Sequence, residues 1–176
     1  DHPFGACVVS RVADLREMFW DPSARAPPLE AWNTSRVTTM THMFRGASTF
    51  DQPLGAWDVA QVTYMNGMFW EAGNFNGPVE AWNVGQVTTM GYMFGVATAF
   101  DQPLGAWDVG KVTNLKSMFF RATAFDQPLG AWDVAQVTTM NSMFYNAQAF
   151  NQYLCWDLSE SVNTAGMFTN SPGTVN

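Results

Sequence analysis

Apolar and aromatic residues recur along this chain with a period of 25 residues. One column of the repeat holds only tryptophan and another holds only phenylalanine, without a gap over five repeats: Trp32, Trp57, Trp82, Trp107 and Trp132, and Phe50, Phe75, Phe100, Phe125 and Phe150. All 11 methionines fall into two further columns, which we interpret as core filling rather than as a promiscuous binding surface. A fixed period of this length is typical of repeat arrays, so we expect these columns to form one core that continues from coil to coil.

The spacing within one repeat predicts two short elements. From Val37 to Ala47, apolar residues recur at intervals of three and four, which indicates a helix packed against its neighbours. From Phe50 to Leu54 the residues alternate, which predicts a brief strand, although Pro53 removes one ladder donor. The Asp or Asn that follows each Trp is expected to close a turn or cap a helix. The prediction is a right-handed α/β solenoid of about seven coils, each rising about 5 Å on its strand side.

The chain is predicted to be a single repeat domain over residues 1–176. Residues 1–25 form a modified N-terminal coil, residues 26–150 form five full repeats, and residues 151–176 form a modified C-terminal coil that is one residue shorter. Cys7 stands at the Trp position of the first coil. Such departures are expected of end coils, because each has a neighbour on one side only.

Composition and charge exclude two classes of partner. Charged residues make up 13% of the chain, about half of the roughly 25% typical of soluble domains. The formal net charge is -7 and the basic residues are scattered singly, so we do not expect nucleic acid as a partner. No apolar run approaches the roughly 18 residues of a membrane-spanning helix, so no span is predicted.

The sequence offers no constellation for catalysis. His42 stands alone in its column and neither Cys7 nor Cys155 has an accompanying His, so we predict no catalytic residue, no cofactor and no metal site. The two cysteines lie in the first and last coils, about 25 to 30 Å apart at about 5 Å per coil, which excludes an intramolecular disulfide. Whether they are free or paired between molecules stays open.

Three polar patterns have alternative interpretations. Asp and Asn interchange in the columns that begin at Asp51 and Asp58, which favours turn formation over a Ca²⁺ site. A column of threonines that begins at Thr38 could order water as an ice-binding surface does, which is a remote alternative. The predicted helix argues against it, because it would not hold these side chains on a flat face. Asn33, in Asn33-Thr34-Ser35, is a weak candidate for glycosylation.

One column varies as a binding surface would. It follows the repeated Phe of the predicted helix and carries large aromatic side chains beside one arginine, a combination that protein interfaces and sugar sites favour. The candidate partner-binding residues are Trp20, Arg45, Trp70, Phe120 and Tyr145, with Gly95 between the third and the fourth. The alternative is that these side chains merely pack between coils.

The repeated phrase resembles that of a known family. It reads Trp-Asp-Val-x-x-Val-Thr-x-Met-x-x-Met-Phe from Trp132 to Phe144, followed by Ala-x-x-Phe-Asn/Asp-Gln from Ala147 to Gln152. This phrase is similar to the repeats of the BspA-like leucine-rich repeat surface proteins, and the resemblance extends from about Val12 to Phe168. It implies a leucine-rich-repeat-like fold and a role at the cell surface or outside the cell, in adhesion or matrix binding.

The combined expectation is a nonenzymatic extracellular or cell-surface repeat module that binds a protein or a glycan. A low-charge, aromatic-filled array also suits a structural scaffold or linker subunit of a larger assembly. The two alternatives differ in that a binding module is expected to be a free monomer, whereas an assembly subunit is expected to purify with its neighbours.

Overall fold

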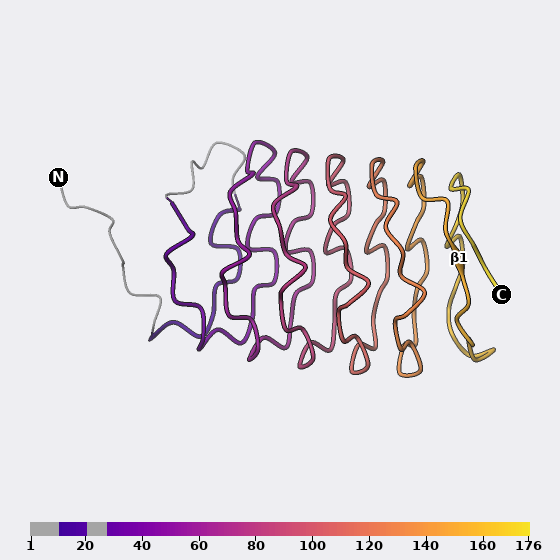
Figure 1. Ribbon diagram of the computed structural model, residues 1–176, viewed down its shortest axis with the longest axis horizontal. Coiled ribbons are helices and arrows are strands. Elements are labelled where there is room, and N and C mark those ends of the chain that lie inside the picture. The colour runs from indigo at the N-terminus through magenta and orange to yellow at the C-terminus, as the bar shows by residue number, and fades with distance from the viewer. Residues whose placement is uncertain (1–10, 21–27) are drawn as a thin grey trace.

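Equivalent positions of successive repeats stack directly on one another. The computed structural model describes residues 11–20 and 28–176, which wind into coils that follow one another along a single axis (Figure 1). A chain of single-residue parallel bridges joins one position of every coil to the same position of the next: Asp14, Thr39, Tyr64, Thr89, Asn114, Thr139 and Asn163. The 25-residue period is therefore the length of one coil, and it shortens to 24 at the last step.

The helix expected between Val37 and Ala47 is wrong, and so are its equivalents in the other described coils. These segments consist of tight turns. In the segment that starts at Met65, the N–H of Met68 donates to the Met65 carbonyl at 3.3 Å, while the N–H of Gly67 donates to Gly91 of the next coil at 2.8 Å. A helix directs its N–H groups to its own carbonyls four residues back, whereas here alternate N–H groups leave the coil.

The strand expected at Phe50–Leu54 is also wrong for most coils. In the described part of the chain, only the last coil has strands: β1, Tyr153–Leu154, and β2, Thr174–Val175. They form a parallel pair with Tyr153 opposite Thr174 and Leu154 opposite Val175. The last coil has Tyr153 where the earlier coils have proline, and in this pair the N–H groups of Thr174 and Asn176 donate to the Gln152 and Leu154 carbonyls, at 3.0 and 3.2 Å.

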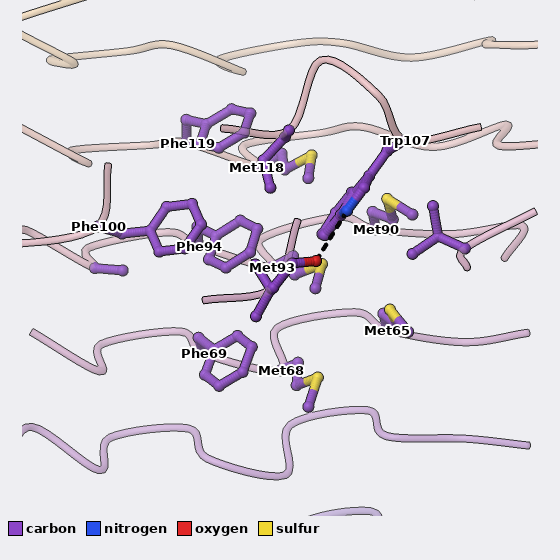
Figure 2. Close-up of a cluster of buried hydrophobic side chains, with 14 of the residues drawn as sticks. Met65, Met68, Phe69, Met90, Met93, Phe94, Phe100, Trp107, Met118 and Phe119 are labelled. Carbon is purple, nitrogen blue, oxygen red and sulfur yellow. Dashed lines mark hydrogen bonds between the residues drawn. The ribbon is translucent and has the colours of Figure 1, made fainter. Parts of the chain in front are cut away.

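Stacked aromatic rings fill the core. Phe94 lies 5.6 Å from Phe69 and 5.8 Å from Phe119, nearly parallel to both, and 3.8 Å from Phe100 of its own coil, measured between ring centroids. Figure 2 shows the rings of Phe69, Phe94 and Phe119 in line, with methionines of each coil beside them. These rings are fully buried, so each contributes about 1.5–3 kcal/mol to folding through burial alone.

Each buried tryptophan ties its coil to the preceding one. The Nε1–H of Trp107 donates to the Val79 carbonyl at 3.1 Å (Figure 2), and the same carbonyl accepts the N–H of Trp82 at 3.1 Å. The equivalent indole bonds run from Trp57, Trp82, Trp132 and Trp156 to the carbonyls of Leu29, Leu54, Leu104 and Leu129. The Trp column is buried from Trp57 to Trp132 and half-buried at Trp32, and the Phe column is buried from Phe50 to Phe150.

Polar columns add side-chain ladders to this backbone. The Thr88 hydroxyl donates to the Thr63 carbonyl at 3.1 Å, and the other members of the file that begins at Thr38 repeat this contact. In the column of Asp51, one Oδ1 accepts the N–H of the next member, as between Asp101 and Asp126 at 3.0 Å. Asp and Asn interchange there because both offer the same acceptor oxygen.

Some residues occupy the left-handed region of backbone conformation, where most side chains are strained. Val96 has φ of 59°, in the column where Gly46 and Asn146 also have positive φ. A β-branched residue is more strained in this conformation than glycine or asparagine, because its side chain crowds the backbone.

The first prediction concerns the indole bonds. Trp107→Phe is expected to lower the free energy of unfolding by about 2–3 kcal/mol, through the lost hydrogen bond and the smaller ring. The matched control is Trp20→Phe, where 49% of the side chain is exposed and a change of about 0.5 kcal/mol or less is expected. Urea unfolding of both variants checks this, and equal losses would contradict the role given to the indole.

The second prediction concerns Val96. Val96→Asn is expected to raise the free energy of unfolding by about 1 kcal/mol, because asparagine accepts the left-handed conformation at lower cost. The same change at the half-buried Val162, which does not have positive φ, is expected to destabilise the protein by loss of apolar contacts. Thermal unfolding of the two variants shows whether the two substitutions change the stability in opposite directions.

Candidate functional site

Exposed and half-buried aromatic and cationic side chains form a strip along the turns of the coils. We call this strip the aromatic face and define it by its members: Trp20, Arg45, Trp70, Tyr92, Lys116, Phe120, Arg121 and Tyr145. At its N-terminal end the Arg45 guanidinium lies between two indole rings, 4.7 Å from the Trp20 centroid and 4.3 Å from the Trp70 centroid. The Nε of Arg45 is buried without a hydrogen-bond partner, so the two ring faces provide its stabilising contacts.

The strip continues through two further pairs of rings. Trp70 stacks on Tyr92 with 4.9 Å between centroids, and the Lys116 ammonium lies 5.4 Å from the Tyr92 ring. Phe120 stacks on Tyr145 at 5.2 Å, and the Arg121 guanidinium lies 5.2 Å from the Phe120 ring. The rings are therefore held in fixed orientations, which lowers the entropy cost of presenting them to a partner.

A hollow interrupts the strip between Trp70 and Phe120. The residue between them in the same column is Gly95, which contributes no side chain. The hollow measures about 490 Å³ and is lined by Trp70, Glu71, Tyr92, Val96, Lys116, Ser117, Phe120, Arg121, Asn141 and Ser142. We call it the Gly95 hollow. Its volume lies within the roughly 300–1,000 Å³ of small-molecule sites.

The charges around the Gly95 hollow are two cations and one anion. Lys116 and Arg121 face it together with Glu71. In the part of the chain that the structure describes, the salt bridge is between Arg16 and Asp14, outside this hollow, so neither Lys116 nor Arg121 is neutralised by an ion pair. Although the chain carries -7 in total, the hollow carries a local excess of one positive charge.

The structure brings the sequence-predicted binding residues into two groups. Trp20, Arg45 and Trp70 form one stack, and Phe120 and Tyr145 form the other. Sequence reasoning missed Tyr92, Lys116 and Arg121, which belong to neighbouring columns. A signal for Tyr92 was present, because it is a large side chain in a column otherwise of small or polar residues and lies three residues before Gly95.

The other candidate residues lie apart from the aromatic face. Asn33 is exposed, and its Oδ1 accepts the Ser35 N–H at 3.1 Å, so the glycosylation triplet forms a turn. Cys155 is an exposed free cysteine, whereas Cys7 lies outside the described residues. The absence of a disulfide between Cys7 and Cys155 therefore stays a prediction.

The acidic columns have two structural roles, of which turn formation was predicted from the sequence and the ladder between coils was not. The Oδ1 of Asp58 accepts the Ala60 N–H at 3.0 Å, and the Oδ1 of Asp126 accepts the N–H of Asn151 at 2.8 Å. Within residues 11–20 and 28–176, no three His, Cys, Asp or Glu side chains gather as metal ligands do. Over the same ranges, no helix has both the length and the apolar character needed to cross a bilayer.

The architecture and its exposed strip define a repeat protein whose coils share one backbone pattern. Residues 2–104 and residues 76–175 each match the family model described as "Mycoplasma protein of unknown function, DUF285", and the chain belongs to this family. The overlap of the two matches reflects the internal repeat. No curated protein and no solved structure matches the chain.

The third prediction concerns His42, which lies beside the aromatic face. Its imidazole packs over Gly67, where an added Cβ would lie 2.2 Å from the His42 Cδ2, and its ring is 6.2 Å from the Trp70 ring. Burial lowers the pKa of His42, the Arg45 charge lowers it further, and Glu17 opposes the shift.

Because the folded state disfavours the protonated imidazole, stability is complete above the ordinary pKa of histidine and falls as the pH decreases below about 6.5. His42→Asn, which suits the positive φ of 56° at this position, is expected to flatten the dependence of the melting temperature on pH between 7.5 and about 5. Carboxylates titrate mainly below this window, so an unchanged slope would contradict the assignment.

Proposed function

We propose that this chain is a nonenzymatic repeat module, related to the BspA-like leucine-rich repeat surface proteins, that binds a protein or glycan partner at the cell surface or outside the cell. The observation that carries the proposal is the aromatic face. Large rings and cations lie side by side there, with Trp20 and Arg121 exposed and the other members half-buried, in a protein with few surface charges. Aromatic and arginine side chains dominate the energetics of binding surfaces.

The packing of the face supports binding rather than internal stabilisation alone. The core beneath it is already filled by the Phe and Met columns, which are buried in the inner coils, whereas Met18 of the first coil is 49% exposed and Phe19 and Phe168 of the end coils are partly buried. Trp20 keeps 49% of its surface exposed although it stacks on Arg45. A ring that stays partly in water adds less to stability than a buried ring, so the grouping of these partly exposed rings in one strip favours a partner as its explanation.

The repeat phrase supports the location and the leucine-rich-repeat-like fold. The phrase from Trp132 to Phe144 resembles the repeats of the BspA-like surface proteins, and the family model matches repeats at both ends of the chain. Buried columns that repeat, combined with surface columns that vary, are the arrangement that repeat proteins use for binding. Protease treatment of intact source cells, followed by immunoblotting, tests the surface location.

The fourth prediction tests binding through the face. The purified chain is immobilised and screened against extracellular matrix proteins and a glycan array, and the partners found are measured by surface plasmon resonance. Trp70→Ala and Phe120→Ala are each expected to weaken binding at least about tenfold, as buried aromatic anchors do. The matched control is Tyr64→Ala, because Tyr64 is 51% exposed and lies outside the aromatic face.

Circular dichroism and melting temperatures establish that each variant is folded. Folded Trp70→Ala and Phe120→Ala variants that bind like the unchanged chain would contradict the proposal. Light scattering on protein purified from its native source distinguishes a free binding module from a scaffold subunit. A large complex of fixed stoichiometry would favour the scaffold subunit.

A further inference from the structure

We infer that the two ends of the array bind each other between molecules, so that the last coil of one copy stacks on the first coil of a second copy. The first and last described coils lie at opposite ends of the long axis, so one copy cannot close this contact on itself (Figure 1). The contact goes beyond the proposed function and does not depend on it, because it needs no partner other than a second copy.

The last coil carries a row of free backbone donors. In the inner coils, the N–H groups of this segment donate to carbonyls of the following coil, as Phe144 donates to Met167 at 2.8 Å. The equivalent N–H groups of the last coil have no hydrogen-bond partner in the described part of the chain: those of Thr164, Gly166, Phe168 and Asn170. From Ser161 to Ser171 there is neither a charged residue nor a proline, the residues that commonly block an open edge. The last coil therefore ends the array as an unblocked donor edge.

The first described coil offers the matching acceptors. In the second coil, the carbonyls of Thr39, Thr41 and Met43 accept N–H groups of the first coil at 2.8 to 3.1 Å. The equivalent carbonyls of the first coil accept no hydrogen bond from any described residue: those of Asp14, Arg16, Met18 and Trp20. A second copy stacked with the same register would set four donors opposite four acceptors in the same order.

The apolar columns favour the same register. Met18 is 49% exposed, whereas the other members of its column, each of which has a coil before it, are buried, with Met167 at 3%. Phe19 and Phe168 are partly buried, and each stacks on one neighbour of its own column at 5.4 Å. A copy placed before the first coil would cover Met18 and bring Phe168 against Phe19. Burial of this apolar surface would stabilise the contact.

The side-chain charges do not oppose the contact. At the acceptor end, Asp14 is already paired with Arg16 at 2.7 Å. At the donor end, residues 161–176 include no charged side chain. Like charges are therefore not brought together when the two ends meet.

The order of donors and acceptors also excludes a contact between like ends. Two donor ends would set N–H groups against N–H groups, and two acceptor ends would set carbonyls against carbonyls, so neither pair forms hydrogen bonds. The contact is therefore heterologous and leaves one end free at every step. Such contacts build open chains or rings rather than closed two-fold dimers.

The fifth prediction is assembly that depends on concentration. Sedimentation velocity is measured on the 19.5 kDa chain from about 10 µM to about 1 mM, a range that suits a weak contact. A reducing agent is present so that the exposed Cys155 cannot link two copies. The weight-average mass is expected to rise past that of two chains, because each added copy presents a new free end.

Two variants block one end each. Met18→Lys and Thr164→Glu would each bury a charge in an apolar column at the contact, since Thr164 stands in the column of Leu15. Both side chains are exposed in the single copy, so both variants are expected to fold, as circular dichroism checks. Each is expected to weaken association at least about tenfold. The matched controls are Tyr64→Lys and Gln61→Glu, which add the same charges at exposed positions of an inner coil and are expected to assemble normally.

A mixture of the two blocked variants tests the direction of the contact. Met18→Lys keeps its donor end and Thr164→Glu keeps its acceptor end, so an equal mixture is expected to form a complex of two chains and nothing larger. Three outcomes would overturn the inference: a chain that stays monomeric over the whole range, a folded Met18→Lys variant that assembles like the unchanged chain, and a mixture that stays monomeric or grows past two chains. A monomeric chain that still binds a matrix protein through Trp70 would leave the proposed function standing.

Discussion

Each coil of this protein satisfies its backbone through its neighbour. The N–H groups of Met65, Gly67 and Phe69 donate to carbonyls of the following coil, at distances of 2.8 to 3.1 Å. A buried backbone donor without a partner costs about as much as a lost hydrogen bond, so a single coil in isolation has no stable form. The indole bond of each Trp and the hydroxyl bonds of the Thr file add to the same coupling, and the stability of the array therefore grows with each neighbouring pair.

This dependence on the neighbour explains which features could be predicted from sequence. A residue whose side chain must meet its own copy in the next coil repeats at the period, so the stacked columns of Trp, Phe and Met could be predicted from the period alone. The interchange of Asp and Asn predicted turn formation, which the column of Asp58 confirms, whereas the ladder between coils in the column of Asp51 was not predicted. These predictions needed no knowledge of how the backbone runs within a coil.

The local backbone was harder to predict, because a helix and a pair of consecutive tight turns give the same spacing of apolar residues. Residues at intervals of three and four face one side of a helix, but they also face one side of two consecutive tight turns, as Met65, Met68, Phe69 and Ala72 do here. What separates the two is the left-handed conformation at two positions four residues apart, such as Gly67 and Glu71, in each coil from His42 onward. Residues such as Val96 and Arg121 adopt that conformation here. Their residue types do not predict it, because glycine or asparagine is the usual sequence signal.

The candidate site was predictable only in part, for a related reason. The variable column identified Trp20, Arg45, Trp70, Phe120 and Tyr145, because its members do not repeat. They nevertheless pack between coils, as Arg45 does between Trp20 and Trp70. Lys116 and Arg121 were missed because a turn lets side chains from different columns converge on one surface, which no single column reveals.

A constant backbone with one variable column gives a simple way to build a binding site in a repeat protein. The large residues of the column meet at the spacing of the coils, so a row of them closes the surface, as Trp20, Arg45 and Trp70 do. At Gly95 the column has no side chain, and Tyr92 of the same coil stacks on Trp70 instead, with the Lys116 ammonium 5.4 Å from the Tyr92 ring. The hollow beside these residues is lined by Trp70, Tyr92 and Phe120 and by the cations Lys116 and Arg121. The site therefore requires no change of fold, and the core columns that hold the coils together remain free of functional demands.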